Sequence, residues 1–155
     1  MQLTRFTDYS LRVLMYLGGQ FDHLVTIKEI ARKHNVSKNH LMKVVHGLAT
    51  YGYIVTVRGR GGGMRLSRRP EKINLGDVVR DTEENMNIAE CFGVDAQSCT
   101  LLPACVLKSV LTEARKNFLA TLNMYQLSDL IHAQMEAGAL TQVASPATAR
   151  KSASR

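Results

Sequence analysis

The feature that most restricts the fold is a pair of helix-start signals close together in the chain. Thr26 followed by Glu29 has the form of a capping box, which predicts a short helix that stops near Asn35. Ser37 then suits the cap of a second helix, which is predicted to end around residues 51–52. The apolar positions of this second helix recur at helical spacing and are Leu41, Val44, Val45 and Leu48. Two short helices joined by a tight turn predict a helix-turn-helix.

A short β-hairpin is predicted directly after this motif. Residues 53–57 alternate and are rich in Val, Ile and Thr, residues 58–63 are Arg-Gly-Arg-Gly-Gly-Gly, and a second strand follows over 64–66. The glycine run joins strand to strand and lacks the Gly-Lys-Ser/Thr ending of a nucleotide-binding loop. We therefore interpret the hairpin as a wing. The sequence predicts a mainly α fold with a small β wing, a winged helix-turn-helix.

Positive charge is concentrated in the half of the chain that contains this motif. Residues 1–80 contain fourteen Lys and Arg against five Asp and Glu, a net of +9, while residues 81–155 contain six against eight, a net of −2. A basic half is typical of nucleic-acid binders, although solvated basic faces are also common. In a helix-turn-helix the start of the second helix reads base edges, and wing arginines can contact phosphates or the minor groove. We predict DNA contacts from Arg12, Ser37, Lys38, Asn39, His40, Lys43, Arg58, Gly59, Arg60 and Arg65.

A helix is predicted on either side of the winged motif. Thr7 and Asp8 suit the start of the first helix, and Gly18-Gly19 suits its end. Asn74 suits the cap of a helix over residues 75–81. These elements complete a predicted DNA-binding domain over residues 1–80.

The rest of the chain is predicted to contain a long helix with Pro103 in its first turn. Its apolar stripe is Leu107, Leu111, Ala114, Phe118, Leu122 and Tyr125. The stripe packs either on its own domain or on a second subunit. Because a winged helix-turn-helix normally binds two half-sites as a dimer, we assign residues 103–137 to dimerisation, with an amphipathic helix over 127–137 beside the long one. Residues 138–155 are rich in Ala, Ser, Thr and basic residues and are predicted to be disordered.

Three cysteines, Cys91, Cys99 and Cys105, lie in a loop predicted over residues 81–106. Neither a signal peptide nor a membrane span is predicted, so we expect a cytoplasmic protein with reduced thiols. Structural zinc usually has four ligands and paired cysteines, and ferredoxin-type clusters have four cysteines. Three thiols favour a labile cluster with one iron that takes another ligand. Zinc and three unrelated core cysteines are the alternatives.

Four segments together carry a family resemblance. They are residues 1–9 (Met-Gln-Leu-Thr-Arg-Phe-Thr-Asp-Tyr), 36–44 (Val-Ser-Lys-Asn-His-Leu-Met-Lys-Val), 57–63 (Val-Arg-Gly-Arg-Gly-Gly-Gly), and the cysteines through 102–105 (Leu-Pro-Ala-Cys). The chain resembles, over residues 1–130, the iron-sulfur winged-helix transcription regulators. This family includes the nitric-oxide-sensing repressors NsrR and the cluster-assembly regulators IscR.

The resemblance implies a homodimeric repressor that binds operator DNA and holds a [4Fe-4S] cluster, or alternatively a [2Fe-2S] cluster, through its three cysteines. IscR-like members have a histidine ligand where this chain has Lys108, so the chain is more similar to NsrR. The NsrR branch takes its fourth ligand from an N-terminal aspartate of the partner subunit, and the matching residue is Asp8, which could otherwise be a helix-cap carboxylate.

Nitric oxide is the signal that the resemblance to NsrR implies: it would release the operator and derepress nitric oxide detoxification genes. Iron-responsive members can share the seven-residue gap between Cys91 and Cys99, so an iron-responsive or redox-responsive regulator of the same fold is an alternative. A zinc or iron-sulfur redox protein is the alternative from another class. The sequence has no nucleophile elbow, phosphate-binding loop or dinucleotide fingerprint, so no enzyme is predicted.

Overall fold

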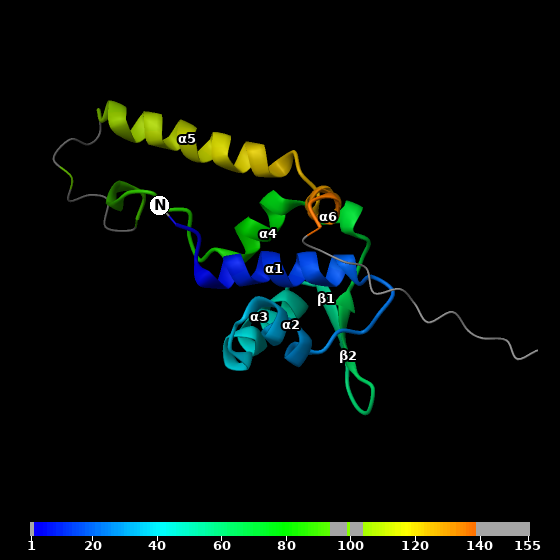
Figure 1. Cartoon of the computed structure of the whole chain (residues 1–155). Helices are drawn as coiled ribbons and strands as arrows, with labels where there is room; N and C mark the ends of the chain where they lie inside the picture. The colour runs from blue at the N-terminus through cyan, green and yellow to red at the C-terminus, as the bar shows by residue number, and fades with distance from the viewer. Residues whose placement is uncertain (1, 94–98, 100–103, 139–155) are drawn as a thin grey trace, which may run out of the picture.

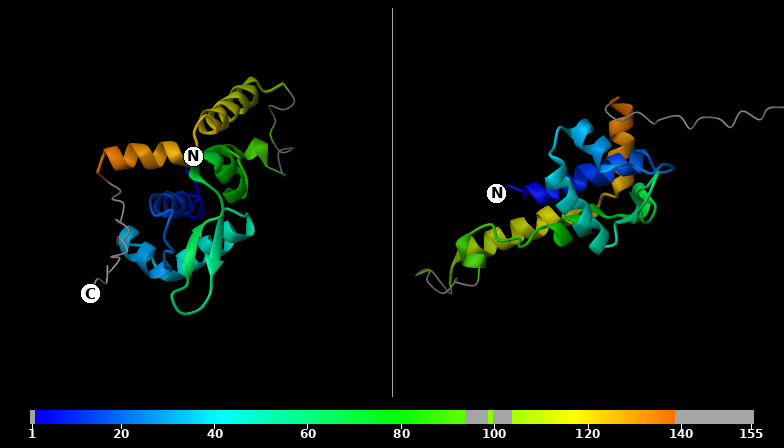
Figure 2. Two further views of the ribbon diagram at one scale, coloured as in Figure 1. Left: turned by 90° about the vertical axis from the view of Figure 1, so that its right-hand side faces the viewer. Right: turned by 90° about the horizontal axis from the view of Figure 1, so that it is seen from below.

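The computed structural model describes residues 2–93, 99 and 104–138. Helix α1 crosses the middle of the molecule, with α2 and α3 on one side and α4 and α6 on the other (Figure 1). Helix α5 extends away from this body, as the two further views also show (Figure 2). The elements are α1 (Arg5–Gly19), α2 (Ile27–His34), α3 (Lys38–Thr50), β1 (Ile54–Val57), β2 (Gly63–Leu66), η1 (Pro70–Lys72), α4 (Leu75–Thr82), η2 (Glu90–Phe92), α5 (Val106–Asn123) and α6 (Leu127–Glu136).

The helix-turn-helix has the caps that the sequence predicts. The Thr26 N–H donates to Glu29 Oε2 at 2.6 Å while the Glu29 N–H donates to Thr26 Oγ1 at 3.3 Å, and these bonds to Thr26 hold the pKa of Glu29 below its usual value. The Ser37 hydroxyl accepts from the His40 N–H at 3.3 Å. Between the two helices Asn35 has a left-handed backbone, with φ of 52°. The turn is therefore made as predicted.

The start of α1 differs from the prediction. Thr4 is the N-cap, and its hydroxyl accepts from the Thr7 N–H at 3.2 Å. Thr7 is therefore inside the helix, where it is fully buried, and Asp8 lies in the first turn. The helix begins at Arg5, earlier than the sequence analysis placed it, because a threonine nearer the chain start takes the capping role.

The wing is a two-stranded antiparallel sheet in which Ile54 pairs with Leu66 and Val57 with Gly63. Ile54, Met64 and Leu66 are buried, and a β-bridge from Met64 to Val25 ties the wing to the segment before α2. The inner ends of the strands are therefore part of the core, while the connecting loop projects from the body (Figure 1). The predicted fold class, mainly α with a small wing, is confirmed.

Helix α6 packs on α1 and η1, not beside the long helix as predicted. Leu127 and Ile131 belong to the hydrophobic core, and a Cβ on Gly18 of α1 would lie only 2.2 Å from Ile131 Cδ1. At the start of α6 the Leu127 N–H donates to Ile73 O at 2.8 Å. This short backbone link brings α6 into the DNA-binding domain.

Helix α5 begins at Val106, and Cys105 is its N-cap residue. Pro103, predicted to start this helix, lies outside the described residues. Leu122 packs against the core, and α5 contacts α4. No side chain of α5 is fully buried, and the exposed fraction is 61% for Leu107. The predicted tail over 138–155 lies outside the described residues except for Gly138.

Candidate DNA-binding surface and cysteine region

The start of α3 presents four exposed polar side chains. Lys38, Asn39, His40 and Lys43 are all exposed, whereas the buried face of the helix is formed by other residues. The Ser37 cap fixes the first turn, so the backbone that carries these side chains is held in place. These predicted DNA-contacting residues therefore lie together on the exposed surface of α3.

Two residues of α1 extend this surface and were not selected from the sequence. A hollow of about 160 Å³ is lined by Arg5, Phe6, Tyr9, His40, Lys43 and Val44. The rings of Tyr9 and His40 stack with centroids 6.4 Å apart. Arg5 and Tyr9 share a face of α1 at a spacing of four residues, but the sequence gives no direct signal that this face lies next to α3.

The wing loop presents Arg58 and Arg60 at its tip and Arg65 on the second strand, all of them exposed. Gly59 has a φ of 102°, a left-handed conformation that favours glycine. Figure 1 shows this loop and α3 on the same side of α1, away from α4, α5 and α6. The arginines and the start of α3 can therefore face one extended ligand.

Arg12 and Asp8 contact each other on α1. Arg12 Nε donates to Asp8 Oδ1 at 3.0 Å, and both side chains are about half exposed. Arg12, predicted to contact DNA, and Asp8, predicted to be a ligand, are thus partners in this chain. An exposed pair of this kind contributes only about 0.3–0.5 kcal/mol, so it can open readily.

His34 lies near this pair, at the end of α2. Its Nε2 atom is buried without a hydrogen-bond partner in the described part of the chain, and its ring meets Tyr16 edge-on with centroids 5.8 Å apart. Desolvation, followed by the charge of Arg12, lowers the pKa of His34 below its usual value. Both effects favour the neutral form of the side chain.

The three cysteines are all partly buried and none forms a disulfide. Cys91 is in η2 and Cys105 is at the N-cap position of α5, while Cys99 is described without its immediate neighbours. Arg115 of α5 lies over the Phe92 ring, 5.0 Å from its centroid, which holds η2 against α5.

The donor chemistry of these cysteines fits an iron-sulfur cluster, because three free thiols share one region of the chain. The described residues of the single chain do not bring three or more Cys, His, Asp or Glu side chains close enough to hold a metal ion.

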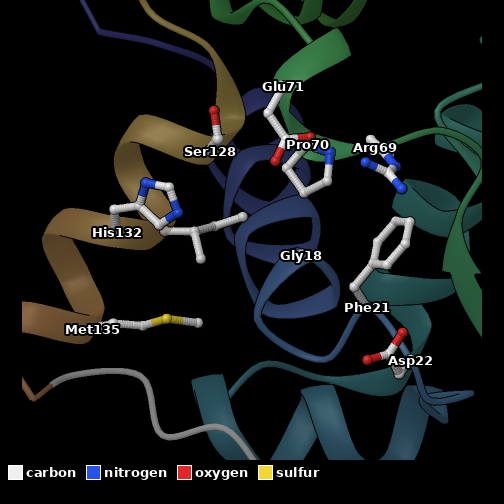
Figure 3. Close-up of a pocket in the computed structure, with 10 residues that line it drawn as sticks. Gly18, Phe21, Asp22, Arg69, Pro70, Glu71, Ser128, His132 and Met135 are labelled. Carbon is white, nitrogen blue, oxygen red and sulfur yellow. The ribbon is translucent and has the colours of Figure 1, made fainter.

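A cleft of about 370 Å³ lies between the end of α1, η1 and α6 (Figure 3). Phe21, Arg69 and His132 are among its lining side chains, and none of the predicted site residues is. No helix in the described ranges is both long enough and apolar enough to span a membrane.

The comparisons with known proteins agree with one another. The Rrf2 family, described as "Iron-dependent Transcriptional regulator", matches residues 3–133. The chain is 52% identical over 132 residues to the HTH-type transcriptional regulator NsrR of Bacillus subtilis, covering 84% of this chain and 90% of that protein. Identity to NsrR of Shouchella clausii is 47% over 143 residues, covering 92% and 96%. Among solved structures, T. potens IscR superposes with a TM-score of 0.71 at 25% identity, covering 94% of this chain and 93% of that one. The chain belongs to the Rrf2 family of transcriptional regulators, and it is a DNA-binding regulator and not an enzyme.

Proposed function

We propose that this protein is a cytoplasmic homodimeric repressor that binds operator DNA and releases it in response to nitric oxide. The observation that carries the proposal is the placement of two chemically distinct regions on one body. Exposed basic and polar side chains of α3 and the wing lie on one side of α1, and the cysteine-bearing ends of η2 and α5 lie on the other (Figure 1). The names of the relatives, NsrR and IscR, support it further.

The DNA-reading roles follow from where each side chain lies. Lys38, Asn39, His40 and Lys43 enter the major groove at the start of α3 and contact base edges or the adjacent phosphates. Arg58, Arg60 and Arg65 hold the phosphate backbone or the minor groove, and Gly59 lets the wing backbone approach closely. In the dimer the two α3 helices occupy half-sites about 34 Å apart.

The second subunit is proposed to cover the outer half of α5. Val106 and Val110 are exposed by 76% and 57%, and Leu107 lies between them on the same stretch of helix. Neighbouring apolar side chains on a helix that no other described element covers are typical of an interface. Dimerisation would remove this apolar surface from water.

Cys91, Cys99 and Cys105 would hold a [4Fe-4S] or [2Fe-2S] cluster, with the partner subunit's Asp8 as the remaining ligand. When bound, the cluster supplies iron atoms with which nitric oxide reacts. The pair with Arg12 uses Asp8 Oδ1, and its half-exposed geometry allows it to open when Asp8 serves the other subunit. Opening the pair frees the Arg12 guanidinium for a phosphate, so the two predicted roles are compatible in one state.

The second candidate is an iron-responsive or redox-responsive regulator of the same fold. It is favoured by the description of the matching family as iron-dependent. Both candidates share the same DNA surface and differ in the signal that acts on the cysteines.

The test is an ultraviolet-visible and circular dichroism titration of anaerobically prepared protein with nitric oxide while DNA binding is followed. Loss of an iron-sulfur absorption band in step with loss of binding is the expected result. A colourless protein that binds DNA regardless of nitric oxide contradicts the proposal. A coloured protein that ignores nitric oxide but responds to iron chelation supports the second candidate.

A further inference from the structure

The segment that carries Cys91 is bonded to the start of α1 through one side chain. Glu83, the first residue after α4, accepts from the Thr4 N–H at 2.8 Å and from the Thr4 hydroxyl at 3.1 Å, both at Oε1. Thr4 is the N-cap of α1. The carboxylate therefore joins the end of one helix to the beginning of another, far away in sequence.

The backbone of Glu83 is itself fixed to α4. Its N–H donates to Val79 O at 3.0 Å, and the hydroxyl of the preceding buried residue, Thr82, donates to Val78 O at 2.7 Å. A carboxylate on a fixed backbone transmits a displacement, whereas one on a free loop would absorb it. Glu83 is thus suited to pass movement between the 83–93 segment and α1.

The far end of the 83–93 segment is fixed to α5 beside the cysteine. Phe92 directly follows Cys91 and lies under Arg115, and a hollow of about 270 Å³ beside the segment is lined by Leu3, Met86 and Phe118 among others. The polar bond of Glu83 and the ring contact of Phe92 thus attach the segment to other elements near its two ends. Glu83 and Cys91 therefore lie near the two ends of one segment that is attached to both α1 and α5.

The start of α1 is in turn in direct contact with the DNA-reading helix. A Cβ on Gly47 of α3 would lie 2.5 Å from Phe6 Cζ, so the Phe6 ring packs directly against the helix backbone. One turn later Tyr9 stacks on His40. Movement of Thr4 reaches α3 through these two rings.

We propose that Glu83 is a positioning residue that couples the cysteine region to α3 within one subunit, through its bonds to Thr4 and the contact of Phe6 with Gly47. This inference rests on the proposed function, since it concerns how the signal reaches DNA. It differs from a ligand role for Glu83, because the carboxylate contacts backbone and hydroxyl groups of α1. It places the coupling within one chain, whereas the proposed ligand role of Asp8 links two subunits.

The test compares Glu83→Ala with the neighbouring Glu84→Ala control in full-length, cluster-loaded protein. Affinity for a DNA duplex, selected from random sequence with the wild-type protein, is measured before and after cluster removal. Coupling factors between sites are typically about 5- to 150-fold. We expect Glu83→Ala to lower the wild-type ratio of the two affinities roughly fivefold or more, with cluster absorption and cluster-free affinity unchanged. Glu84→Ala should keep the wild-type ratio.

Two further measurements separate coupling from a general loss of structure. Glu83→Gln keeps an acceptor oxygen and should retain most of the ratio. Hydrogen exchange of the cluster-free chain should be faster in the first turn of α1 for Glu83→Ala and not for Glu84→Ala, a readout independent of cluster chemistry. A wild-type ratio in Glu83→Ala, or unchanged exchange at α1, overturns the coupling role while leaving the proposed function intact. A wild-type protein with equal affinities in both states overturns the proposed function instead.

Discussion

The close contact of α1 with α6 leads to a quantitative prediction about stability. Ile131 is only 4% exposed and lies against the backbone of α1 at Gly18. Ile131→Ala removes buried methyl and methylene groups from this contact and should lower the free energy of unfolding by about 2–5 kcal/mol. Gly18→Ala places a methyl group 2.2 Å from Ile131 Cδ1.

The two substitutions should compensate each other. Gly18→Ala alone costs about 1–3 kcal/mol by overpacking, offset by up to about 1 kcal/mol of better helix propensity. In the double variant the methyl group introduced at position 18 enters the space that the isoleucine leaves. The double variant should therefore lose about 1–3 kcal/mol less than the sum of the two single losses.

Urea unfolding followed by circular dichroism, at one protein concentration, measures all four free energies. His132→Ala, on the exposed side of the same helix, is the matched control and should change the free energy by less than about 0.5 kcal/mol. Strict additivity of the two substitutions, or a small effect of Ile131→Ala, would refute the packing of α6 on α1.

Three further predictions concern DNA, the cysteine region and pH. Arg60→Ala should weaken binding to all duplexes and lower the slope of log affinity against log salt concentration by roughly one to two. Asn39→Ala should instead relax the preference for one base at a single position of the duplex. Equal effects of the two substitutions across a panel of competitor duplexes would contradict the assignment of Arg60 to the backbone and Asn39 to a base. Asp8→Ala should alter cluster stability or its response to nitric oxide, and an unaltered absorption spectrum and response would exclude the ligand role. The lowered pKa of His34 means that the unfolded chain binds the proton more tightly, so stability should fall as pH drops below about 6.5. His34→Gln should remove that part of a urea-midpoint pH profile, and an unchanged profile would contradict it.

The sequence predicts the helix caps correctly where a side chain forms a hydrogen bond with the backbone of a residue close to it in the chain. The capping box of Thr26 and Glu29, the Ser37 cap and the Asn74 cap all occur as predicted, because each bond spans two or three residues. The start of α1 was placed too late because Thr4 and Thr7 both suit a cap. Burial of Thr7 against the rest of the fold decides between them, and local sequence does not contain that information.

The predictions about contacts between elements far apart in the sequence failed for a different reason. The amphipathic pattern of α6 shows that one face is buried but not which element covers it, and Ile131 meets α1 instead of α5. Arg5 and Tyr9 were missed for the same reason, since their closeness to His40 depends on how α1 crosses α3. The role of the cysteines stays a prediction, because the described residues of one chain do not bring a full ligand set together.

The junction at the end of α5 has a mechanical consequence. The Asn74 amide donates to Asn123 O at 2.8 Å and Arg80 donates to Asn123 Oδ1 at 3.0 Å, while the Leu75 N–H donates to Tyr125 O. The helix is therefore clamped at one end, and its 18 residues form an arm of about 27 Å at 1.5 Å per residue. A tilt of about 5° at the clamp would move the free end, which carries Cys105, by roughly 2 Å along an arm of this length. A small rotation of α5 at α4 therefore produces a much larger displacement of the Cys105 thiol. A displacement of the thiol, in turn, produces a small rotation of the helix at α4.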